Sequence, residues 1–253
     1  MSGNPGMQRA DVLLVELGLA ASRTAAQGLI DAGRVSADGK RVGKSSLKLP
    51  PDAEISITPD ESDRYVSRGG LKLAGALAHT GLDVAGLLAL DVGISTGGFT
   101  DCLLQAGARK VIGVEVGHDQ LHPRLLADPR VTQFEGVNAR HLTAQLIAPA
   151  QDGPIGVVVG DVSFISLTLI LPAIASVLQS GARLLFLVKP QFEVGPQRIG
   201  KGGIVRDDAC YPEVEAKIRA AADAAGFTVL DYLNSPITGG DGNREFFIYA
   251  VFR

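Results

Sequence analysis

The chain has 253 residues, of which 46% are apolar, 5% are aromatic and none is Trp. This usage is typical of a soluble α/β protein and argues against a largely disordered chain. No stretch reaches the ~20 apolar residues that a membrane span requires, so we expect a cytoplasmic protein with no membrane partner. The two cysteines, Cys102 and Cys210, are too far apart in sequence to form a metal-binding or redox pair, and no metal site is predicted.

The net charge of -3 conceals an uneven distribution. Residues 1–50 carry seven Lys or Arg against four Asp or Glu, whereas the remaining residues carry 17 against 23. A small basic segment therefore precedes a larger acidic one. Charge alone favours a nucleic-acid partner only weakly, because most charged residues simply decorate a solvated surface.

The N-terminal region has the pattern of two helices followed by a hairpin. Residues 11–18, DVLLVELG, predict an amphipathic helix that stops at a glycine. Ser22 is a natural N-cap for a second helix, which Gly33 would end. Asp38-Gly39 is a strong hairpin signal, and residues 53–58, AEISIT, alternate as a strand does.

We predict that this first domain spans residues 7–60 and that a polar linker, residues 61–66, joins it to a second domain over residues 67–253. Basic residues recur at its helix starts and around its turn. They are either solvated decoration or an exposed basic face, because so small a domain has little interior. These residues are Arg9, Arg23, Arg34, Lys40, Arg41, Lys44 and Lys48.

In the second domain, a predicted helix at residues 67–81 precedes seven strand-like runs. The first five runs are continuously apolar, as buried parallel strands are, and only a loop separates the last two, which should pair antiparallel. We therefore predict a Rossmann-like α/β fold with a seven-stranded, mostly parallel sheet and an antiparallel last strand. The runs are LLALDVG, KVIGVEVG, VTQFEGV, GVVVGDVS, RLLFLVK, TVLDYL and EFFIYAVF.

Ligands of open α/β sheets bind at the carboxyl ends of the strands, so residues there are candidates for a site. After the first strand, Gly93, Gly97 and Gly98 permit a tight turn, and the following helix would direct free N–H groups at a ligand. Glu115 ends the second strand, where a carboxylate can accept hydrogen bonds from a ribose diol. This combination indicates a ligand that contains adenosine. The dinucleotide fingerprint is absent, but the pattern alone does not separate NAD from S-adenosylmethionine.

Four charged residues stand at the edges of apolar elements. Asp161 follows the fourth strand and Lys189 ends the fifth, so each would make burial of the other tolerable. Lys72 lies on an otherwise apolar helix, and Glu245 opens the last strand. We predict one polar cluster at the rim of the sheet. A purely structural ion pair between Asp161 and Lys189 is the competing explanation.

Two further patterns are less specific. His118 and His122 have helical spacing, but Pro123 interrupts them and no third ligand is near, so polar surface residues are favoured over a metal site. Residues 195–207, GPQRIGKGGIVRD, form a basic, glycine-rich segment. This segment is either a cover for a phosphate backbone or a plain connecting loop.

Five blocks of the chain occur in a fixed order: DVGISTGGFTDCLLQAGA, DVSFISL, LVKPQFEVG, GKGGIVRD and GGDGNREFF. Together they resemble the hemolysin-A-like (TlyA) family of ribosomal RNA 2'-O-methyltransferases, which are related to the FtsJ/RrmJ type. The N-terminal domain resembles the small RNA-binding domain of ribosomal small-subunit protein S-four. The resemblance extends over residues 8–252, nearly the whole chain.

The resemblance implies methyl transfer from S-adenosylmethionine to a ribose 2'-hydroxyl, expected to be that of a cytidine, in ribosomal RNA within ribosomal subunits. It also implies a seven-stranded methyltransferase sheet, and we expect a monomer or weak dimer. The family's catalytic tetrad falls on Lys72, Asp161, Lys189 and Glu245. The implied cofactor-binding residues are Asp91, Gly93, Ser95, Thr96, Gly97, Gly98, Phe99, Glu115 and Asn138. The expected RNA-binding residues are Arg9, Arg23, Arg34, Lys40, Arg41, Lys44, Arg68 and Lys201.

Lys189 would act as a general base or stabilise the developing oxyanion, with the other three residues of the tetrad positioning it and orienting the ribose. The chain departs from the family at Glu115, where Asp is usual, and at Gly160, where a larger residue is common. A loop-capping role is the alternative for Asn138. Three alternative functions stay open on sequence alone: a ribosome-assembly factor without chemistry, a membrane-active hemolysin and a nicotinamide enzyme.

Overall fold

The computed structural model describes residues 6–20 and 22–253, and the chain divides into two compact units. The first unit ends at Asp63 and the second begins at Arg64. This boundary falls within residues 61–66, the stretch expected to be a linker, where a short 3-10 turn spans Glu61–Arg64. Each unit has its own buried apolar cluster, so the sequence encodes two separate cores.

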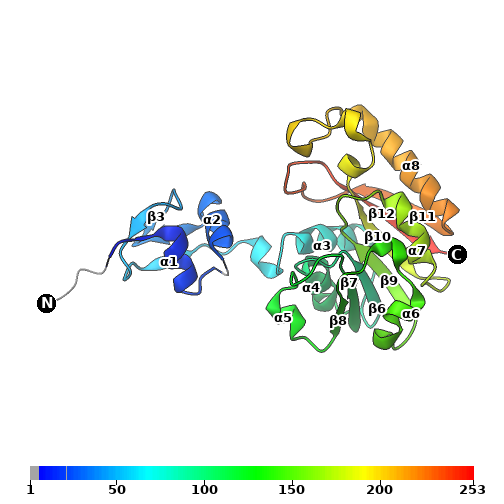
Figure 1. Ribbon diagram of the computed structural model, residues 1–253, viewed down its shortest axis with the longest axis horizontal. Helices are drawn as coiled ribbons and strands as arrows, with labels where there is room; N and C mark the ends of the chain where they lie inside the picture. The colour runs from blue at the N-terminus through cyan, green and yellow to red at the C-terminus, as the bar shows by residue number, and fades with distance from the viewer. Residues whose placement is uncertain (1–5, 21) are drawn as a thin grey trace. The chain divides into compact units, whose positions relative to one another are not determined.

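Two helices supply much of the core of the first unit (Figure 1). The helix α1 (Ala10–Glu16) directs residues such as Leu13 into this core. The helix α2 (Arg23–Asp31) begins at Ser22, whose Oγ accepts a hydrogen bond from the backbone N–H of Ala25. The predicted helices and the predicted N-cap are therefore present.

Short strands complete the first unit. The hairpin predicted at Asp38-Gly39 is present, because both residues adopt positive φ and join two antiparallel strands. A third strand pairs with the first of these, and two strands of two residues each form a separate pair that the sequence pattern did not predict. The strands are β2 (Val35–Ala37), β3 (Lys40–Arg41), β5 (Ile55–Ile57), β1 (Gln8–Arg9) and β4 (Lys48–Leu49).

A mixed sheet of seven strands forms the centre of the second unit (Figure 1). In spatial order the strands are β11 (Phe227–Asn234), β12 (Phe246–Phe252), β10 (Arg183–Val188), β9 (Ile155–Gly160), β6 (Leu88–Val92), β7 (Lys110–Val114) and β8 (Val131–Phe134). The strands from β10 to β8 run parallel, and β12 is antiparallel to both of its neighbours. The predicted α/β fold, with a mostly parallel sheet and an antiparallel last strand, is confirmed.

Helices cover both faces of this sheet (Figure 1). One face packs against α3 (Gly69–Thr80), α4 (Gly98–Gln105) and α5 (Pro123–Leu126). The opposite face packs against α6 (Ala144–Ile147), α7 (Leu171–Ala175) and α8 (Tyr211–Ala224). Strand β6 is buried along its whole length, which explains why its sequence is a continuous apolar run rather than an alternating one.

Several short 3-10 turns connect these elements. The 3-10 turns of the second unit beyond Arg64 are Ala139–His141, Ala148–Ala150, Leu167–Leu169, Pro190–Phe192, Pro196–Arg198, Lys201–Gly203 and Asp208–Cys210.

Among the described helices, none combines the length and the apolar character needed to cross a bilayer.

The register of the sheet brings several strand ends to one edge. Gly160, the last residue of β9, pairs with Val92 at the end of β6. Val188, the last residue of β10, pairs with Phe246, the first residue of the antiparallel β12. Residues immediately beyond these four positions therefore meet at the same edge, although they come from distant parts of the sequence.

Gly160 is a departure from the resembled family, and the neighbouring strand explains it. A Cβ atom at this position would lie 2.3 Å from the ring of Phe186 and 2.7 Å from the carbonyl oxygen of Val92. The ring on β10 therefore occupies the volume that a larger side chain on β9 would need. A small residue at position 160 and a large one at position 186 keep the core at normal packing density.

Candidate cofactor pocket and charged cluster

A cavity of about 700 Å³ opens at the carboxyl edge of the parallel strands, within the size range of small-molecule sites. Its wall combines the loops after β6, β7, β8, β9 and β10 with the start of α3 and the loop that precedes β12. Asp91, Gly97 and Glu245 lie outside the wall. The predicted site residues that line it are Arg68, Lys72, Gly93, Ser95, Thr96, Gly98, Phe99, Glu115, Asn138, Asp161 and Lys189.

The glycine-rich turn after β6 is shaped by close contacts. Gly93 has a φ of 81°, and a Cβ atom there would lie 2.9 Å from the carbonyl oxygen of Asp161. Gly97 has a φ of 92°, and its Cβ atom would clash with the side chain of Leu125. Only glycine fits both positions, so the backbone can approach a ligand closely and α4 begins beside the cavity.

Glu115 holds this turn from the end of β7. One oxygen of its buried carboxylate accepts the backbone N–H of Ser95 at 3.0 Å, and the other accepts that of Gly117 at 2.9 Å. Each carboxylate oxygen has a second lone pair, so Glu115 can also accept hydroxyl hydrogens from a ligand. The predicted ribose-binding carboxylate therefore also fixes the conformation of the turn.

Asp91 lies beneath the turn rather than in the wall of the cavity. It is buried, and its Oδ2 accepts the hydroxyl of Thr100 on α4 at 2.7 Å. Its Oδ1 is also buried and has no hydrogen-bond partner among the described residues. Burial is the main cause that raises the pKa of Asp91 to about 7; the hydrogen bond from Thr100 opposes this shift, and the nearby charges of Asp161 and Glu115 add to it.

The four predicted catalytic charges form a chain of contacts. Lys189 Nζ lies 2.5 Å from Asp161 Oδ1, and Lys72 Nζ lies 2.6 Å from Glu245 Oε2. Lys72 Nζ also lies 3.8 Å from Asp161 Oδ2, which links the two pairs. All four side chains are largely covered. The structure thus brings together every residue of the predicted cluster.

Lys189 has one further partner that the sequence analysis did not consider. Its Nζ donates to Ser163 Oγ at 2.9 Å, in the loop that follows β9. A hydrogen bond to Ser163 and an ion pair with Asp161 therefore hold the end of the Lys189 side chain at the cavity wall. Asn138 also lines the cavity, and its side-chain oxygen accepts the backbone N–H of Arg140 at 3.0 Å, which is the loop-capping role considered above.

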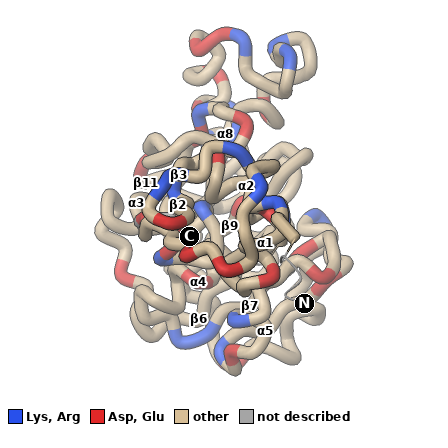
Figure 2. The backbone as a smooth tube through the Cα atoms, turned by 90° about the vertical axis from the view of Figure 1, so that its left-hand side faces the viewer, with Lys and Arg blue, Asp and Glu red and all other residues tan. Residues whose placement is uncertain are grey.

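The predicted RNA-binding residues have different surroundings. In the first unit, Arg9 and Arg23 both donate to the buried carboxylate of Asp11. Arg34 is largely covered, because it bonds the carbonyl oxygen of Thr58 and pairs with Asp63. Lys40, Arg41 and Lys44 are exposed. Figure 2 marks Lys and Arg along the backbone in blue, and such positions lie beside α2 and β3.

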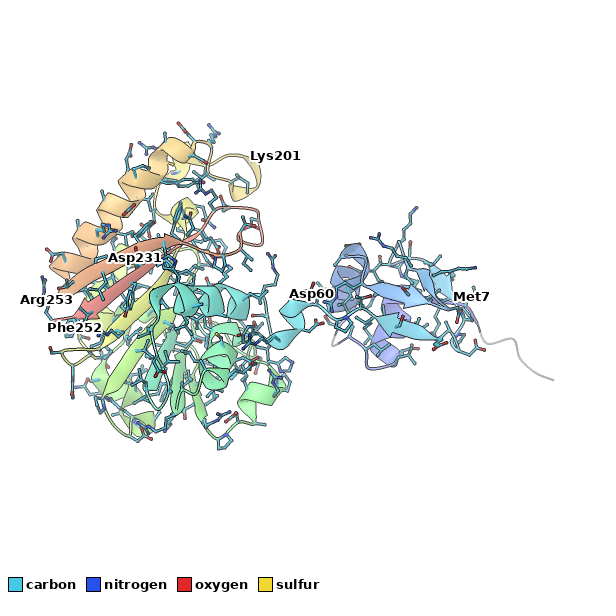
Figure 3. The ribbon with its side chains drawn as sticks, turned by 180° about the vertical axis from the view of Figure 1, so that it is seen from behind. Met7, Asp60, Lys201, Asp231, Phe252 and Arg253 are labelled. Carbon is cyan, nitrogen blue, oxygen red and sulfur yellow. The ribbon has the colours of Figure 1, made fainter. Side chains whose placement is uncertain are left out.

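In the second unit, Arg68 lines the cavity and donates to the carbonyl oxygen of Thr238 at 3.4 Å. Lys201 is exposed on the glycine-rich loop between β10 and α8 (Figure 3). Asn243 is buried and anchors this loop: it accepts the N–H of Val205 and donates to the carbonyl oxygen of Gly203, both at 3.0 Å. The loop therefore has a defined attachment beside Glu245, which immediately precedes β12 rather than opening it as predicted.

Phe164 is a functional candidate that the sequence analysis missed. Its side chain is 90% exposed, its φ is 62°, and it lines the cavity. Exposure of a large aromatic ring is unfavourable, and a left-handed backbone is strained for a bulky residue. Both features together indicate a binding role. In the sequence, no local signal set this Phe apart from the other apolar residues around it.

No group of three or more His, Cys, Asp or Glu in the described part of the chain is arranged to hold a metal ion. His118 and His122 are accordingly not part of such a group. His122 instead caps α5, because its Nδ1 accepts the backbone N–H of Arg124 at 3.2 Å.

The sheet order, the glycine-rich turn and the edge cavity define an α/β domain of the methyltransferase class. A solved S-adenosylmethionine-dependent methyltransferase from Mesorhizobium loti shares this fold, with a TM-score of 0.51 at 15% identity over 70% of this chain and 96% of that one. Residues 65–252 match the FtsJ-like methyltransferase family, and residues 8–55 match the S4 domain. The chain therefore belongs to the FtsJ-like methyltransferase family and carries an S4 domain.

Two relatives resemble nearly the whole chain. The 16S/23S rRNA (cytidine-2'-O)-methyltransferase TlyA of Mycobacterium tuberculosis (strain H37Rv) is 40% identical over 95% of this chain and 88% of its own length. A solved structure from Streptococcus thermophilus that carries a hemolysin name is 41% identical, covers 98% of this chain and 89% of its own, and has a TM-score of 0.76. The resemblance to the TlyA, hemolysin-A-like group is thereby confirmed.

The raised pKa of Asp91 gives a prediction for stability. The folded state binds this proton more tightly than the unfolded state, so the contribution of Asp91 is most favourable at low pH and is lost as pH rises from about 4 to about 7. We expect Asp91→Asn, which does not titrate, to be relatively stabilising at roughly pH 8, by at most about 4 kcal/mol, compared with roughly pH 5. Thermal unfolding of both proteins at the two pH values measures this, and an equal difference at both would contradict it.

Proposed function

We propose that this protein transfers a methyl group from S-adenosylmethionine to the 2'-hydroxyl of a cytidine ribose in ribosomal RNA. The observation that carries the proposal is the chain of four charges, Lys189 to Asp161 to Lys72 to Glu245, beside a cavity with an adenosine-binding turn. Relatives that span nearly the whole chain and are named for this reaction support it.

The residues present fit S-adenosylmethionine. Gly93 and Gly97 form a cradle that any Cβ atom would fill, and α4 presents its free N–H groups at the cavity. Glu115 stands where it can accept the two ribose hydroxyls, and Asn138 lines the same cavity. Asp91 supports the turn from below through Thr100. When bound, the cofactor supplies a methyl group on a sulfonium sulfur, which is already electrophilic.

We assign Lys189 to activating the nucleophile, which is the ribose 2'-hydroxyl. A ribose hydroxyl must lose its proton as the new bond to carbon forms, and the resulting negative charge on oxygen needs a partner. The amino group of Lys189 can hold that proton or stabilise that charge. Asp161 and Ser163 fix its position at 2.5 Å and 2.9 Å, so little reorganisation is needed at the moment of reaction.

Lys72 and Glu245 complete the cluster behind this pair. Lys72 shares its charge between Glu245 and Asp161, so neither carboxylate is buried without a partner. Glu245 lies outside the cavity wall, and we therefore assign it to holding Lys72 rather than to direct contact with the ribose. This assignment refines the ribose-orienting role that the family resemblance suggested.

Phe164 provides a surface for the target nucleotide. Its exposed ring lies three residues after Asp161, at the cavity wall, and packs against Phe192 with 5.2 Å between the ring centroids. Aromatic rings stack on bases without regard to sequence, and single-stranded RNA is commonly bound in this way. Phe164 and Lys189 line the same cavity, so a base stacked on Phe164 could direct its ribose into the cavity that Lys189 borders.

The S4 domain and the basic residues of both units suit an RNA partner. Lys40, Lys44 and Lys201 have no ion pair among the described residues, so their charges are free for phosphate. We propose that ribosomal RNA in ribosomal subunits is the partner and that the protein acts in the cytoplasm. Methylation of separated subunits and of naked RNA with labelled cofactor, followed by mapping of the modified riboses, tests this. Label on a base atom would contradict the proposed reaction.

Lys189→Ala tests the catalytic assignment. We expect turnover to fall by about 10²-fold or more, the usual range for a lost acid-base group, with little change in the affinity for S-adenosylmethionine. Lys110→Ala is the matched control. Lys110 begins β7, at the end of this strand that lies away from the cavity, and its Nζ donates a hydrogen bond to the carbonyl oxygen of Ala150. Single-turnover methylation and calorimetry measure the two quantities. Near-normal turnover of Lys189→Ala would refute the assignment.

Phe164→Ala tests the stacking surface. Loss of one base stack is worth ~1–3 kcal/mol, so kcat/KM for RNA should fall by about 5- to 150-fold, whereas cofactor affinity stays unchanged. Phe164→Tyr should keep most of the activity, because a tyrosine ring stacks equally well. Leu169→Ala removes another exposed apolar side chain, one that is absent from the cavity wall, and should have no effect. Equal losses in Phe164→Ala and Leu169→Ala would count against stacking.

A further inference from the structure

A buried carboxylate outside the cavity has no part in the function described so far. Glu193 follows the 3-10 turn after β10, and its side chain is only 2% exposed. It does not line the cavity. Burial of a carboxylate is costly unless hydrogen-bond donors or cations surround it, so its contacts show what it does in the fold.

Three donors from two other elements meet Glu193. Its Oε1 accepts the backbone N–H of Leu167 at 2.7 Å, and its Oε2 accepts the hydroxyl of Ser166 at 2.6 Å. Lys217 on α8 donates to the same Oε2 at 2.7 Å and to the backbone carbonyl of Glu193 at 3.0 Å. Both carboxylate oxygens therefore face donors, and Glu193 joins the loop after β9, the loop after β10 and α8.

The two loops joined by Glu193 are those that carry the reactive groups. Ser166 ends the segment that begins at Asp161 and contains Phe164, and Glu193 ends the segment that begins at Lys189. At the other end of both segments stands the contact between Lys189 and Asp161. The two loops are thus connected at both ends, by an ion pair at the cavity and by the Glu193 hydrogen bonds behind it.

We propose that Glu193 is a positioning residue for methyl transfer. Through Ser166 and Leu167 it sets the path of the loop after β9, and hence the placement of Phe164 and Asp161 relative to Lys189. This inference rests on the proposed function, because it assigns Glu193 a role in that same site. A misplacement of about 1 Å in such an arrangement can cost about 10²-fold in rate.

The chemistry of the contacts requires a carboxylate. A glutamine has nearly the same shape, but one of its two terminal atoms is an NH₂ donor. In one orientation that donor would face the N–H of Leu167, and in the other it would face Ser166 and Lys217. Glu193→Gln therefore loses hydrogen bonds in either orientation without a change in volume.

The test compares Glu193→Gln with Glu215→Gln in the full chain. Glu215 lies on the same helix as Lys217 and pairs with Arg219, so this control removes an equivalent charge that contacts neither loop. We expect Glu193→Gln to lower kcat by about tenfold or more with cofactor affinity within about twofold of wild type, and Glu215→Gln to change neither. A kcat within about twofold of wild type would overturn the inference. So would a parallel loss of kcat and cofactor affinity at an unchanged unfolding midpoint, because Glu193 would then act on cofactor binding rather than on the placement of the reactive groups.

Ser166→Ala keeps the inference testable if Glu193→Gln folds poorly. It removes one hydroxyl at the same contact, which also caps the turn Leu167–Leu169, and kcat should fall by about three- to tenfold with cofactor affinity unchanged. Because both variants break one contact, their effects in the double variant should be clearly less than multiplicative. Wild-type kcat in Ser166→Ala, or fully multiplicative effects, would overturn the inference. If the wild-type protein itself transfers no methyl group to ribosomal RNA, the proposed function fails, and the two failures are thereby distinguished.

Discussion

The position of Asp161 between two lysines is the interaction on which the rest of the second unit depends. Lys189 lies 2.5 Å from one of its oxygens and Lys72 lies 3.8 Å from the other. Removal of Asp161 would leave the largely covered amino group of Lys189 without a carboxylate partner, and breaking a buried pair in this way typically costs several kcal/mol. The sheet order must therefore place β9 beside β10 and α3 over their ends. The same charges therefore constrain both the arrangement of these elements and the geometry of the reactive cluster.

The three carboxylates at this edge of the sheet, Glu115, Asp161 and Asp91, have different hydrogen-bond and ion-pair partners. Glu115 accepts two backbone N–H groups and Asp161 faces two lysines, so both have partners suited to a negative charge. Asp91 has only the hydroxyl of Thr100, and the two other carboxylates raise its pKa in addition to burial. Asp161 of the charged cluster thereby acts electrostatically on Asp91 beneath the glycine-rich turn.

The sequence predicted the elements whose signals are local or periodic. Continuous apolar runs identified the parallel strands, and a run that ends in a charge, as at Lys189, identified the site, because a buried charge needs a partner. The pairing of the two-residue strands β1 and β4 was not predicted, because no periodicity can be detected over so short a length. The exposure of Phe164 was not predicted, because it depends on the direction in which a loop leaves the sheet. The role of Glu193 was not predicted, because its partners lie 24 to 27 residues away in sequence.

The basic residues also show what sequence alone cannot predict, because composition does not say which Lys and Arg side chains already pair with a carboxylate. Arg34 is occupied within its own unit, by Asp63 and the carbonyl oxygen of Thr58. Arg9 and Arg23 share Asp11, and hydrogen bonds from Arg9, Gln27 and Arg23 hold the pKa of this carboxyl well below its usual range although burial opposes the shift. A carboxylate that binds two guanidinium groups from below restricts their motion and leaves a net positive charge facing outward. In the proposed RNA-binding role, arginines held in this way would lose less side-chain entropy on meeting a phosphate than free lysines do.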